Sequence, residues 1–299
     1  MDNHRSKHKS IRTEKETSRQ HRNELWYRFK KNKGAMLGLF IIVFLVLVAL
    51  SADFLLDYKT DVIGQNLKER LQSPSLTHLF GTDELGRDLF FRVIYGARFS
   101  ISIGVISVSI GLITGTFFGA IAGYFGGYIE EVIMRITDIM SAIPSILLAI
   151  AIVTALGAST LNLMIAVGVA SIPEFVRITR ASVLMVRNQE FIEAARALGV
   201  KEWKIIISHV LPNALAPIIV QTTLTTGSSI ISASGLSFLG LGVPAPAPEW
   251  GSLLSAGRKF IRGYAYLTLF PGMAIMFTVL AFNLMGDGLR DVLDPKLKQ

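Results

Sequence analysis

Long blocks of apolar residues, separated by polar stretches, dominate the pattern of this chain. The blocks cover residues 34–52, 99–123, 139–176, 213–235 and 267–286. Their apolar residues run on continuously, without the period of 3.6 or 2 that marks a soluble amphipathic helix or strand. A block of about 18 or more residues with few charges is long enough to cross a bilayer as a helix. The pattern therefore predicts an all-α integral membrane protein.

The block at residues 139–176 is too long for a single crossing. As one helix it would measure about 57 Å, nearly twice the thickness of a hydrocarbon core. We expect it to fold back on itself, with a hairpin turn at residues 157–160, Gly-Ala-Ser-Thr. A Gly-rich turn at residues 124–128 leads into this region from the second crossing. The expected total is six transmembrane helices.

The polar stretches give the chain its predicted organisation. Residues 1–33 hold eleven Lys/Arg against four acidic residues and form a basic N-terminal tail before the first helix, residues 34–52. Cationic flanks stay in the cytoplasm, which places both chain ends there. Residues 53–98 and 235–266 then lie outside, and the polar stretch 177–212 inside. The predicted divisions are completed by a five-helix core, residues 99–287, with a cytoplasmic coupling loop at 188–212 and a cytoplasmic tail at 288–299.

Composition narrows the function classes. Hydrophobic residues make up 51% of the chain and charged residues 17%, whereas about 25% charged residues is typical of soluble proteins. A net charge of +8 would suggest nucleic acid in a soluble protein. Here the excess sits in the tail beside a membrane helix, so the lipid surface is the expected partner and nucleic acid is not. The absence of cysteine excludes disulfides and thiolate chemistry. The tail is also too polar and too long for a cleaved signal peptide.

The second predicted helix carries four glycines at four-residue spacing. Missing side chains on one face allow close helix packing in a membrane. The partner helix is either another part of this chain or a neighbouring subunit, and the spacing leaves both open. The residues are Gly111, Gly115, Gly119 and Gly123.

The fifth predicted helix presents a polar face that is a candidate translocation pathway. Its hydroxyls can instead bond to carbonyls of the preceding helical turn, which would make them packing residues. A glutamine in a membrane helix usually faces protein or water. The predicted helices lack the relay of Asp, Glu or His that proton-coupled carriers need. The pathway candidates are Gln221, Thr222, Thr225, Ser229 and Ser232.

Two short helices broken by a glycine are predicted in the coupling loop. Residues 191–199 read as one helix ended by Gly199, and residues 201–210 as a second helix, ended by Leu211-Pro212. Such a pair forms a rigid elbow that can sit in a groove of a partner protein. A surface helix lying at the membrane interface is the alternative.

The elbow sequence resembles a known family. Glu193-Ala194-Ala195, followed by Gly199 and Leu211-Pro212, is similar to the EAA loop of permeases of ATP-binding cassette (ABC) importers. His209 departs from the aliphatic residue usual in that family two places before the leucine. Three further segments resemble its dipeptide, oligopeptide and nickel branch: residues 80–88, residues 236–242 with 249–251, and residues 286–291.

The resemblance implies a type I importer permease with a MetI-like core, the C-type member of two permease subunits. Such a chain forms half of a translocation pathway for peptides in the bacterial inner (plasma) membrane. The implied partners are a homologous permease subunit, two ATP-binding subunits and an external substrate-binding protein. The implied contacts with the ATPase are Glu193, Ala194, Ala195, Gly199, Leu211 and Pro212.

Energy must then come from elsewhere, because the chain has no G-x-x-x-x-G-K-[ST] phosphate loop. ATP and Mg²⁺ are expected on the partner subunits, with no cofactor on this chain. We predict no catalytic residue and no metal site. Asp83, Glu84 and Asp88 near His78 suggest salt bridges or helix capping rather than metal ligands.

The outer segments that match the family are candidates for gating or for contact with the binding protein. They comprise Thr82, Asp83, Gly86, Arg87, Asp88, Glu249, Trp250 and Gly251. Nickel or metal chelates, glutathione and oligosaccharides are alternative cargoes. An ion-coupled carrier, or an enzyme embedded in the membrane, is the alternative class.

Overall fold

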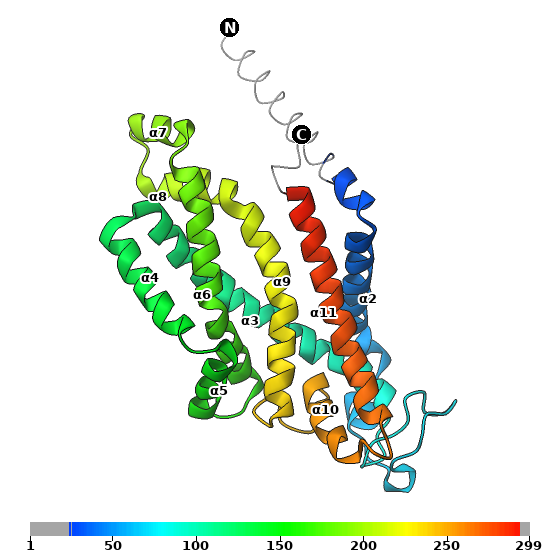
Figure 1. Cartoon of the computed structure of the whole chain (residues 1–299). Helices are drawn as coiled ribbons and strands as arrows, with labels where there is room; N and C mark the ends of the chain where they lie inside the picture. The colour runs from blue at the N-terminus through cyan, green and yellow to red at the C-terminus, as the bar shows by residue number, and fades with distance from the viewer. Residues whose placement is uncertain (1–23, 25, 294–299) are drawn as a thin grey trace.

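The computed structural model describes residues 24 and 26–293, and all named elements within them are helical (Figure 1). Most of the basic tail predicted at 1–33 lies outside the described residues, and so does the end of the predicted C-terminal tail, 294–299. The elements are α2 (Lys33–Leu55), η1 (Tyr58–Val62), η2 (Leu67–Glu69), α3 (Leu89–Phe125), α4 (Gly127–Ser141), α5 (Ser145–Leu156), α6 (Thr160–Arg187), α7 (Glu190–Ala197), α8 (Glu202–Ile205), η3 (Ile206–Val210), α9 (Leu211–Phe238), α10 (Trp250–Gly257), η4 (Arg258–Phe260) and α11 (Tyr266–Leu293).

Five helices of the described residues are long and apolar enough to cross a membrane: α2, α3, α6, the continuous helix Glu202–Phe238 and α11. The pair α4 and α5 meets the same criteria together, with a bend of 85° between them. Pro144 causes the bend, since it lacks a backbone N–H and pushes the residue before it out of the helical region. With this broken pair counted as one crossing, the predicted six-helix membrane fold is confirmed. The turn expected at residues 157–160 is confirmed too, between α5 and α6.

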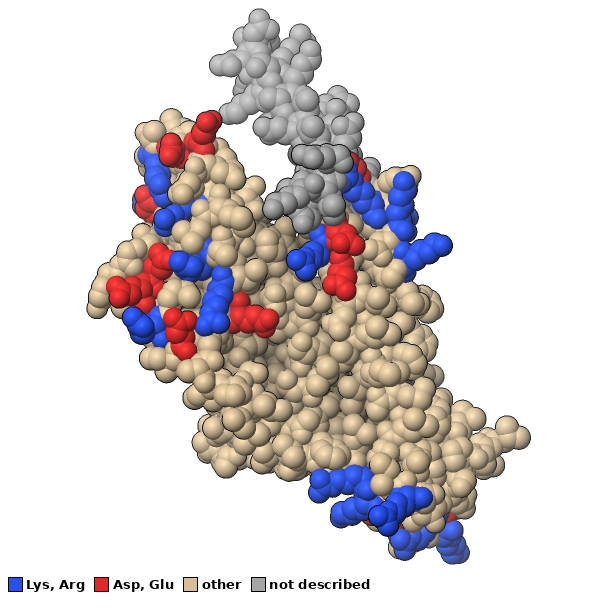
Figure 2. Space-filling model, in the orientation of Figure 1, with Lys and Arg blue, Asp and Glu red and all other residues tan. Residues whose placement is uncertain are grey.

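The helices run between two ends of the molecule. Residues 190–205, comprising α7, the connection and α8, are called the elbow from here on. The elbow lies at the same end as the start of α2 and the end of α11, and α10 lies at the opposite end (Figure 1). On the face drawn in Figure 2, charged side chains gather at the two ends and leave a band free of charge between them. That band matches the apolar layer that a bilayer requires.

Several helices extend beyond the boundaries predicted from hydropathy. α3 begins at Leu89, not at residue 99; α6 continues through residues 177–187, which were expected in a loop; α11 continues to Leu293, beyond the residue 287 expected. The extensions carry charges that the fold satisfies. Arg180 Nε donates to Glu130 Oε1 at 2.6 Å, and Arg187 Nη1 donates to the Gly123 carbonyl at 2.8 Å. Hydropathy counts such residues as loop because it cannot see their partners.

Leu211-Pro212 does not separate the elbow from the next membrane helix, contrary to the prediction. α8, η3 and α9 form one continuous helix. η3 is a π-helical turn that ends two residues before Pro212. Its wider turn gives room where a proline ring would otherwise meet the carbonyl of the preceding turn. The end of the elbow is therefore joined to α9 by unbroken helix.

The four-glycine face of α3 packs against α6 of the same chain. A Cβ added at Gly119 would lie 2.6 Å from the carbonyl oxygen of Val176 and 2.7 Å from Thr179 Cβ. One added at Gly123 would lie 2.8 Å from the carbonyl oxygen of Arg180. Gly111 and Gly115 face Ser171 and Phe175 in the same way. The structure thus resolves the open alternative in favour of packing within the chain.

Candidate functional site

The turn of the elbow is set by Gly199. Its φ of +74° lies in the left-handed region that glycine adopts without strain. The Gly199 N–H donates to the Arg196 carbonyl at 2.9 Å and the Val200 N–H to the Ala195 carbonyl at 3.2 Å, which closes the end of α7. A Cβ added at Gly199 would meet nothing within 4 Å. The requirement for glycine is therefore one of backbone conformation, not of space.

The two faces of α7 have different environments. Ile192 is fully buried and Ala195 nearly so, and both pack against the ends of α3 and α6 and the start of the following helix. Glu193 and Ala194 are exposed, and Leu198 at the tip is 83% exposed. The helix is thus held by its inner face and presents a small, partly apolar outer face. Two further residues predicted to contact the ATPase lie at the start of α9, where Leu211 is half-buried and Pro212 exposed.

A polar cluster fastens the elbow to the end of α3. The Tyr124 hydroxyl bonds to the Glu202 carboxylate of α8 and accepts a hydrogen bond from Arg196 Nε of α7 at 3.3 Å. The Arg196 guanidinium also stacks on the Tyr124 ring, 5.0 Å from its centroid. Arg187, at the end of α6, donates to the Tyr124 carbonyl at 3.2 Å. The elbow, α3 and α6 therefore meet at one tyrosine, which sequence reasoning did not single out.

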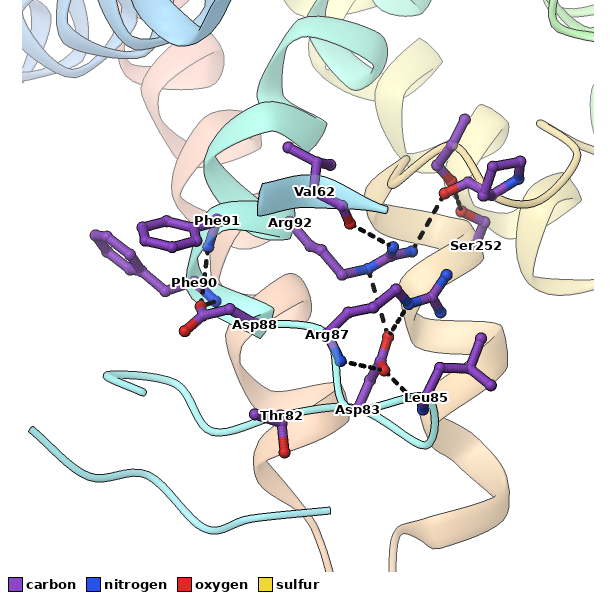
Figure 3. A network of polar contacts seen from close by, with 12 residues as sticks. Val62, Thr82, Asp83, Leu85, Arg87, Asp88, Phe90, Phe91, Arg92 and Ser252 are labelled. Atoms are coloured by element: carbon purple, nitrogen blue, oxygen red, sulfur yellow. Dashed lines mark hydrogen bonds and ion pairs between the residues drawn. The ribbon is translucent and has the colours of Figure 1, made fainter. Parts of the chain in front are cut away.

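The predicted outer signature forms a buried ion-pair network at the opposite end (Figure 3). The Asp83 carboxylate accepts hydrogen bonds from Arg87 Nε at 2.7 Å and from the backbone N–H of Leu85 at 2.8 Å. Arg92 Nε lies 3.6 Å from the same carboxylate. Arg92 Nη1 donates to the Val62 carbonyl at 3.0 Å, so the network ties the segment before α3 to the helix itself.

Other residues of this segment have structural contacts as well. Asp88 caps α3 by accepting from the N–H groups of Phe90 and Phe91, and its second oxygen lies 2.8 Å from His78 Nδ1. The Thr82 carbonyl accepts from the Tyr266 hydroxyl of α11 at 3.0 Å. Asp83 thus forms the predicted kind of salt bridge and Asp88 the predicted kind of helix cap. Gly86 is buried with a φ of +72°, in the turn that brings Arg87 back to Asp83.

Glu249, Trp250 and Gly251 lie inside the same end of the molecule. Glu249 is 1% exposed and caps α10, accepting from the N–H groups of Gly251 and Ser252 at 2.9 Å each. Burial raises the pKa of the Glu249 carboxyl above its usual range. Trp250 Nε1 donates to the Val93 carbonyl of α3 at 2.9 Å. These three residues are buried in this conformation, so they expose no surface for direct contact with a binding protein. Their part in gating stays a prediction.

We expect Asp83→Asn to destabilise this end of the protein. Asparagine carries no charge to compensate the buried guanidinium groups of Arg87 and Arg92, and breaking a buried ion pair costs on the order of 3 kcal/mol. The measurement is the midpoint of thermal unfolding in detergent. Glu84→Gln, a neighbouring carboxylate that forms no ion pair among the described residues, should leave the midpoint unchanged. An unaltered midpoint for Asp83→Asn would show that the network is dispensable.

The polar face of α9 divides into two groups. Thr222 donates its hydroxyl to the Ile218 carbonyl at 2.7 Å, within the same helix, as the packing alternative expected. Ser229 is buried and Ser232 half-buried. Gln221 and Thr225 instead reach across to α6. Within the described residues, these two of the five pathway candidates form side-chain hydrogen bonds to another helix.

Their contact on α6 is Glu174, a carboxylate that was not among the predicted site residues. Gln221 Nε2 donates to Glu174 Oε1 at 2.6 Å, and Thr225 Oγ1 lies 3.4 Å from Glu174 Oε2. The absence of a titratable relay stays a prediction, and the fourth crossing does contain an exposed carboxylate, Glu174. The signal for it was available, since Glu174 follows Pro173 inside a long apolar block.

A cavity of about 520 Å³ opens beside Glu174. It lies between the α4–α5 bend and α6, with one residue of α9 at its edge. Its walls are largely apolar, and its charged residues are Glu174 and Arg177. The lining residues are Met140, Ser141, Ile143, Pro144, Ser145, Ala170, Pro173, Glu174, Arg177, Ile178, Ala181 and Gln221.

Comparison with known proteins places the chain among transport proteins. Residues 115–299 match the family described as binding-protein-dependent transport system inner membrane component, and residues 23–74 match the N-terminal TM domain of oligopeptide transport permease C. The chain is 51% identical over 275 residues to the dipeptide transport system permease protein DppC of Alkalihalophilus pseudofirmus, covering 92% of this chain and 90% of the relative. It is 45% identical over 278 residues to the glutathione transport system permease protein GsiD of Escherichia coli, covering 92% and 91%.

A solved structure shares the fold. An inward-facing conformation of the MetNI methionine ABC transporter matches with a TM-score of 0.57 at 20% sequence identity, over 68% of this chain and 97% of that chain. The helical core is therefore built as in that transporter.

Proposed function

The chain belongs to the binding-protein-dependent transport system inner membrane components, and from this premise we propose that it forms half of the peptide pathway of an ATP-driven importer. It acts as the C-type permease subunit beside a homologous second permease. Two ATP-binding subunits supply the energy, and an external substrate-binding protein delivers the cargo. The observation that carries this assignment is the elbow, whose inner face is packed into the helix ends while its outer face is exposed.

The elbow is the proposed site of energy transfer. Glu193, Ala194 and the exposed Leu198 are available to a partner, and the Gly199 turn fixes the position of α7 relative to α8. ATP-driven closure of the ATPase pair moves the elbow, and the continuous helix Glu202–Phe238 carries this movement into the membrane. The pathway then opens outward, and hydrolysis followed by product release returns it. This chain binds neither ATP nor Mg²⁺ in the proposed cycle.

The elbow supports the proposed orientation in the membrane. Because the ATPases act on ATP in the cytoplasm, the elbow end must face that side. Both described chain ends lie at the elbow end (Figure 1), so both termini are assigned to the cytoplasm. The buried ion-pair network and α10 then face the binding protein. The location is the bacterial inner membrane.

Peptides are the proposed cargo. One relative carries the name of a dipeptide permease and another that of a glutathione permease, and glutathione is itself a peptide with a free α-ammonium group. Neither of these two names refers to nickel, a metal chelate or an oligosaccharide. An ion-coupled carrier is excluded by membership of the family.

The test is uptake of a labelled dipeptide into proteoliposomes. We expect ATP-dependent uptake when this chain is reconstituted with its partner permease, both ATPase subunits and the binding protein. Omitting the ATPases should abolish it. Uptake by this chain alone, or none of any dipeptide or of glutathione by the full assembly, would refute the assignment.

Tyr124→Phe should weaken coupling without preventing assembly. The change removes the hydroxyl that joins Arg196 to Glu202 but keeps the ring that packs against the elbow. With the elbow less firmly held, we expect several-fold fewer peptides imported per ATP hydrolysed. The measurement is the ratio of the two rates in proteoliposomes. Tyr128→Phe, at an exposed tyrosine on α4, is the matched control, and a ratio equal in both variants would contradict the role of Tyr124.

A further inference from the structure

The carboxylate of Glu174 lies halfway along α6, in its apolar half and three residues before the Arg177–Asp138 ion pair that begins its charged end. We propose that Glu174, with Gln221 and Thr225 of α9, forms a subsite that receives the α-ammonium group of the peptide as it crosses. The inference rests on the proposed function and deepens it, since it assigns one end of the cargo to particular residues.

The first argument is charge. The hydrogen-bond donors that reach Glu174 are the neutral amide of Gln221 and the neutral hydroxyl of Thr225. Within the described part of the chain, no Lys, Arg or His nitrogen lies within 4.0 Å of this carboxylate. Arg177, one turn further along α6, is paired with Asp138 at 2.9 Å. An ionised group inside a membrane protein is costly without an opposite charge, so the site favours a cation.

The second argument is space. The cavity beside Glu174 measures about 520 Å³, within the range of about 300–1,000 Å³ common for small-molecule sites. Apolar residues such as Met140, Ile143 and Pro144 form the wall at the α4–α5 bend. Walls of this kind can accept varied peptide side chains, whereas the ammonium group is common to all free peptides. The arrangement therefore suits a pathway that must recognise peptides as a class.

The third argument is position relative to the elbow. α6 leads into the elbow, and α9 continues the helix that leaves it. Glu174 and Gln221 are thus on the two helices that elbow movement would displace. A change in the distance between these two residues would form the ammonium site and then disrupt it, so that the peptide is bound and released in each cycle. Gln221 and Thr225 do not titrate, so the three residues form no proton relay.

The experiment compares wild type with Glu174→Gln in the assembled importer, without nucleotide or binding protein. Binding of alanyl-phenylalanine and of N-acetyl-alanyl-phenylalanine, which lacks the ammonium group, is measured by saturation-transfer NMR. We expect wild type to bind the free peptide at least fivefold more tightly than the acetylated one, and Glu174→Gln to lose this preference. Glu174→Asp, which keeps the charge, should retain part of it. Glu131→Gln, an exposed carboxylate on α4, is the matched control and should behave as wild type.

Uptake assays separate this inference from the proposed function. If the wild-type importer takes up no peptide, the proposed function fails. If it takes up peptide and Glu174→Gln keeps both normal uptake and the preference for a free ammonium group, the subsite is overturned. Loss of the partner permease from purified Glu174→Gln would also overturn it, because the carboxylate would then pair with a cation of that subunit.

Discussion

Gly199→Val and Glu193→Lys should each leave the importer assembled in the membrane and reduce peptide uptake at least tenfold while ATP hydrolysis continues. Gly199 has a φ of +74°, where a side-chain-bearing residue costs roughly 1–2 kcal/mol. Valine adds the restriction of a β-branched side chain. The turn would relax to another conformation, and the outer face of α7 would point elsewhere. Glu193→Lys keeps the turn but reverses the charge of that face.

Two further variants test whether the backbone conformation at Gly199 is the cause of the lost uptake. Gly199→Asn should recover part of the uptake, because asparagine tolerates the left-handed region better than other residues. Gly157→Val makes the same substitution at an exposed turn with a φ of +89°, also with nothing within 4 Å of the new Cβ. It lies between α5 and α6, away from the elbow, and should leave coupling intact. Normal uptake in both Gly199→Val and Glu193→Lys would remove the elbow from the mechanism.

Gly119→Leu should prevent the helices from packing and abolish recovery of folded protein. The new Cβ would lie 2.6 Å from the Val176 carbonyl oxygen and 3.2 Å from the Arg180 nitrogen. Both are backbone atoms, so relief requires α3 and α6 to move apart. Overpacking a well-packed core costs typically about 1–3 kcal/mol, and a clash against backbone should reach the upper end. The individual helices should still insert, since insertion depends on their hydrophobicity.

The measurement is the monodisperse fraction after detergent extraction, by size-exclusion chromatography with fluorescence detection. Gly235→Leu is the matched control, because it is the same change in a membrane helix with no atom within 4 Å of the added Cβ. It should keep the wild-type elution profile. A normal profile for Gly119→Leu would mean that the seam between α3 and α6 can open at little cost.

The amino-acid sequence alone was sufficient to locate the elbow. Its helix–glycine–helix pattern is local, since a glycine at a helix end satisfies backbone groups within a few residues. Which face of α7 is buried and which is exposed could be seen only in the structure. Whether Glu193 or Ala195 points outward depends on where α3 and α6 end. Tyr124 has its role only because the folded chain brings back to it Arg196 and Glu202, which come 72 and 78 positions later in the sequence.

The boundaries of the helices show a similar limit. Residues 89–98 and 177–187 carry arginines, so hydropathy assigned them to loops. In the folded chain those arginines have partners, such as Val62 for Arg92 and Glu130 for Arg180. The outer signature was recognised from its sequence, but its burial was not. A charge in sequence indicates solvent unless a distant partner compensates it.

The sequence by itself determined the class of protein, the set of crossings and the glycine turn. Water is absent from the bilayer core, so a crossing is apolar and satisfies its backbone polar groups within helices, and long apolar runs are visible in the sequence. Only the tertiary structure decided that the glycine face of α3 packs within the chain, that Glu249 is buried, and that Glu174 meets Gln221. The last two residues are 47 positions apart. Such pairs form because packing brings two helices together, and no local pattern specifies which faces will meet.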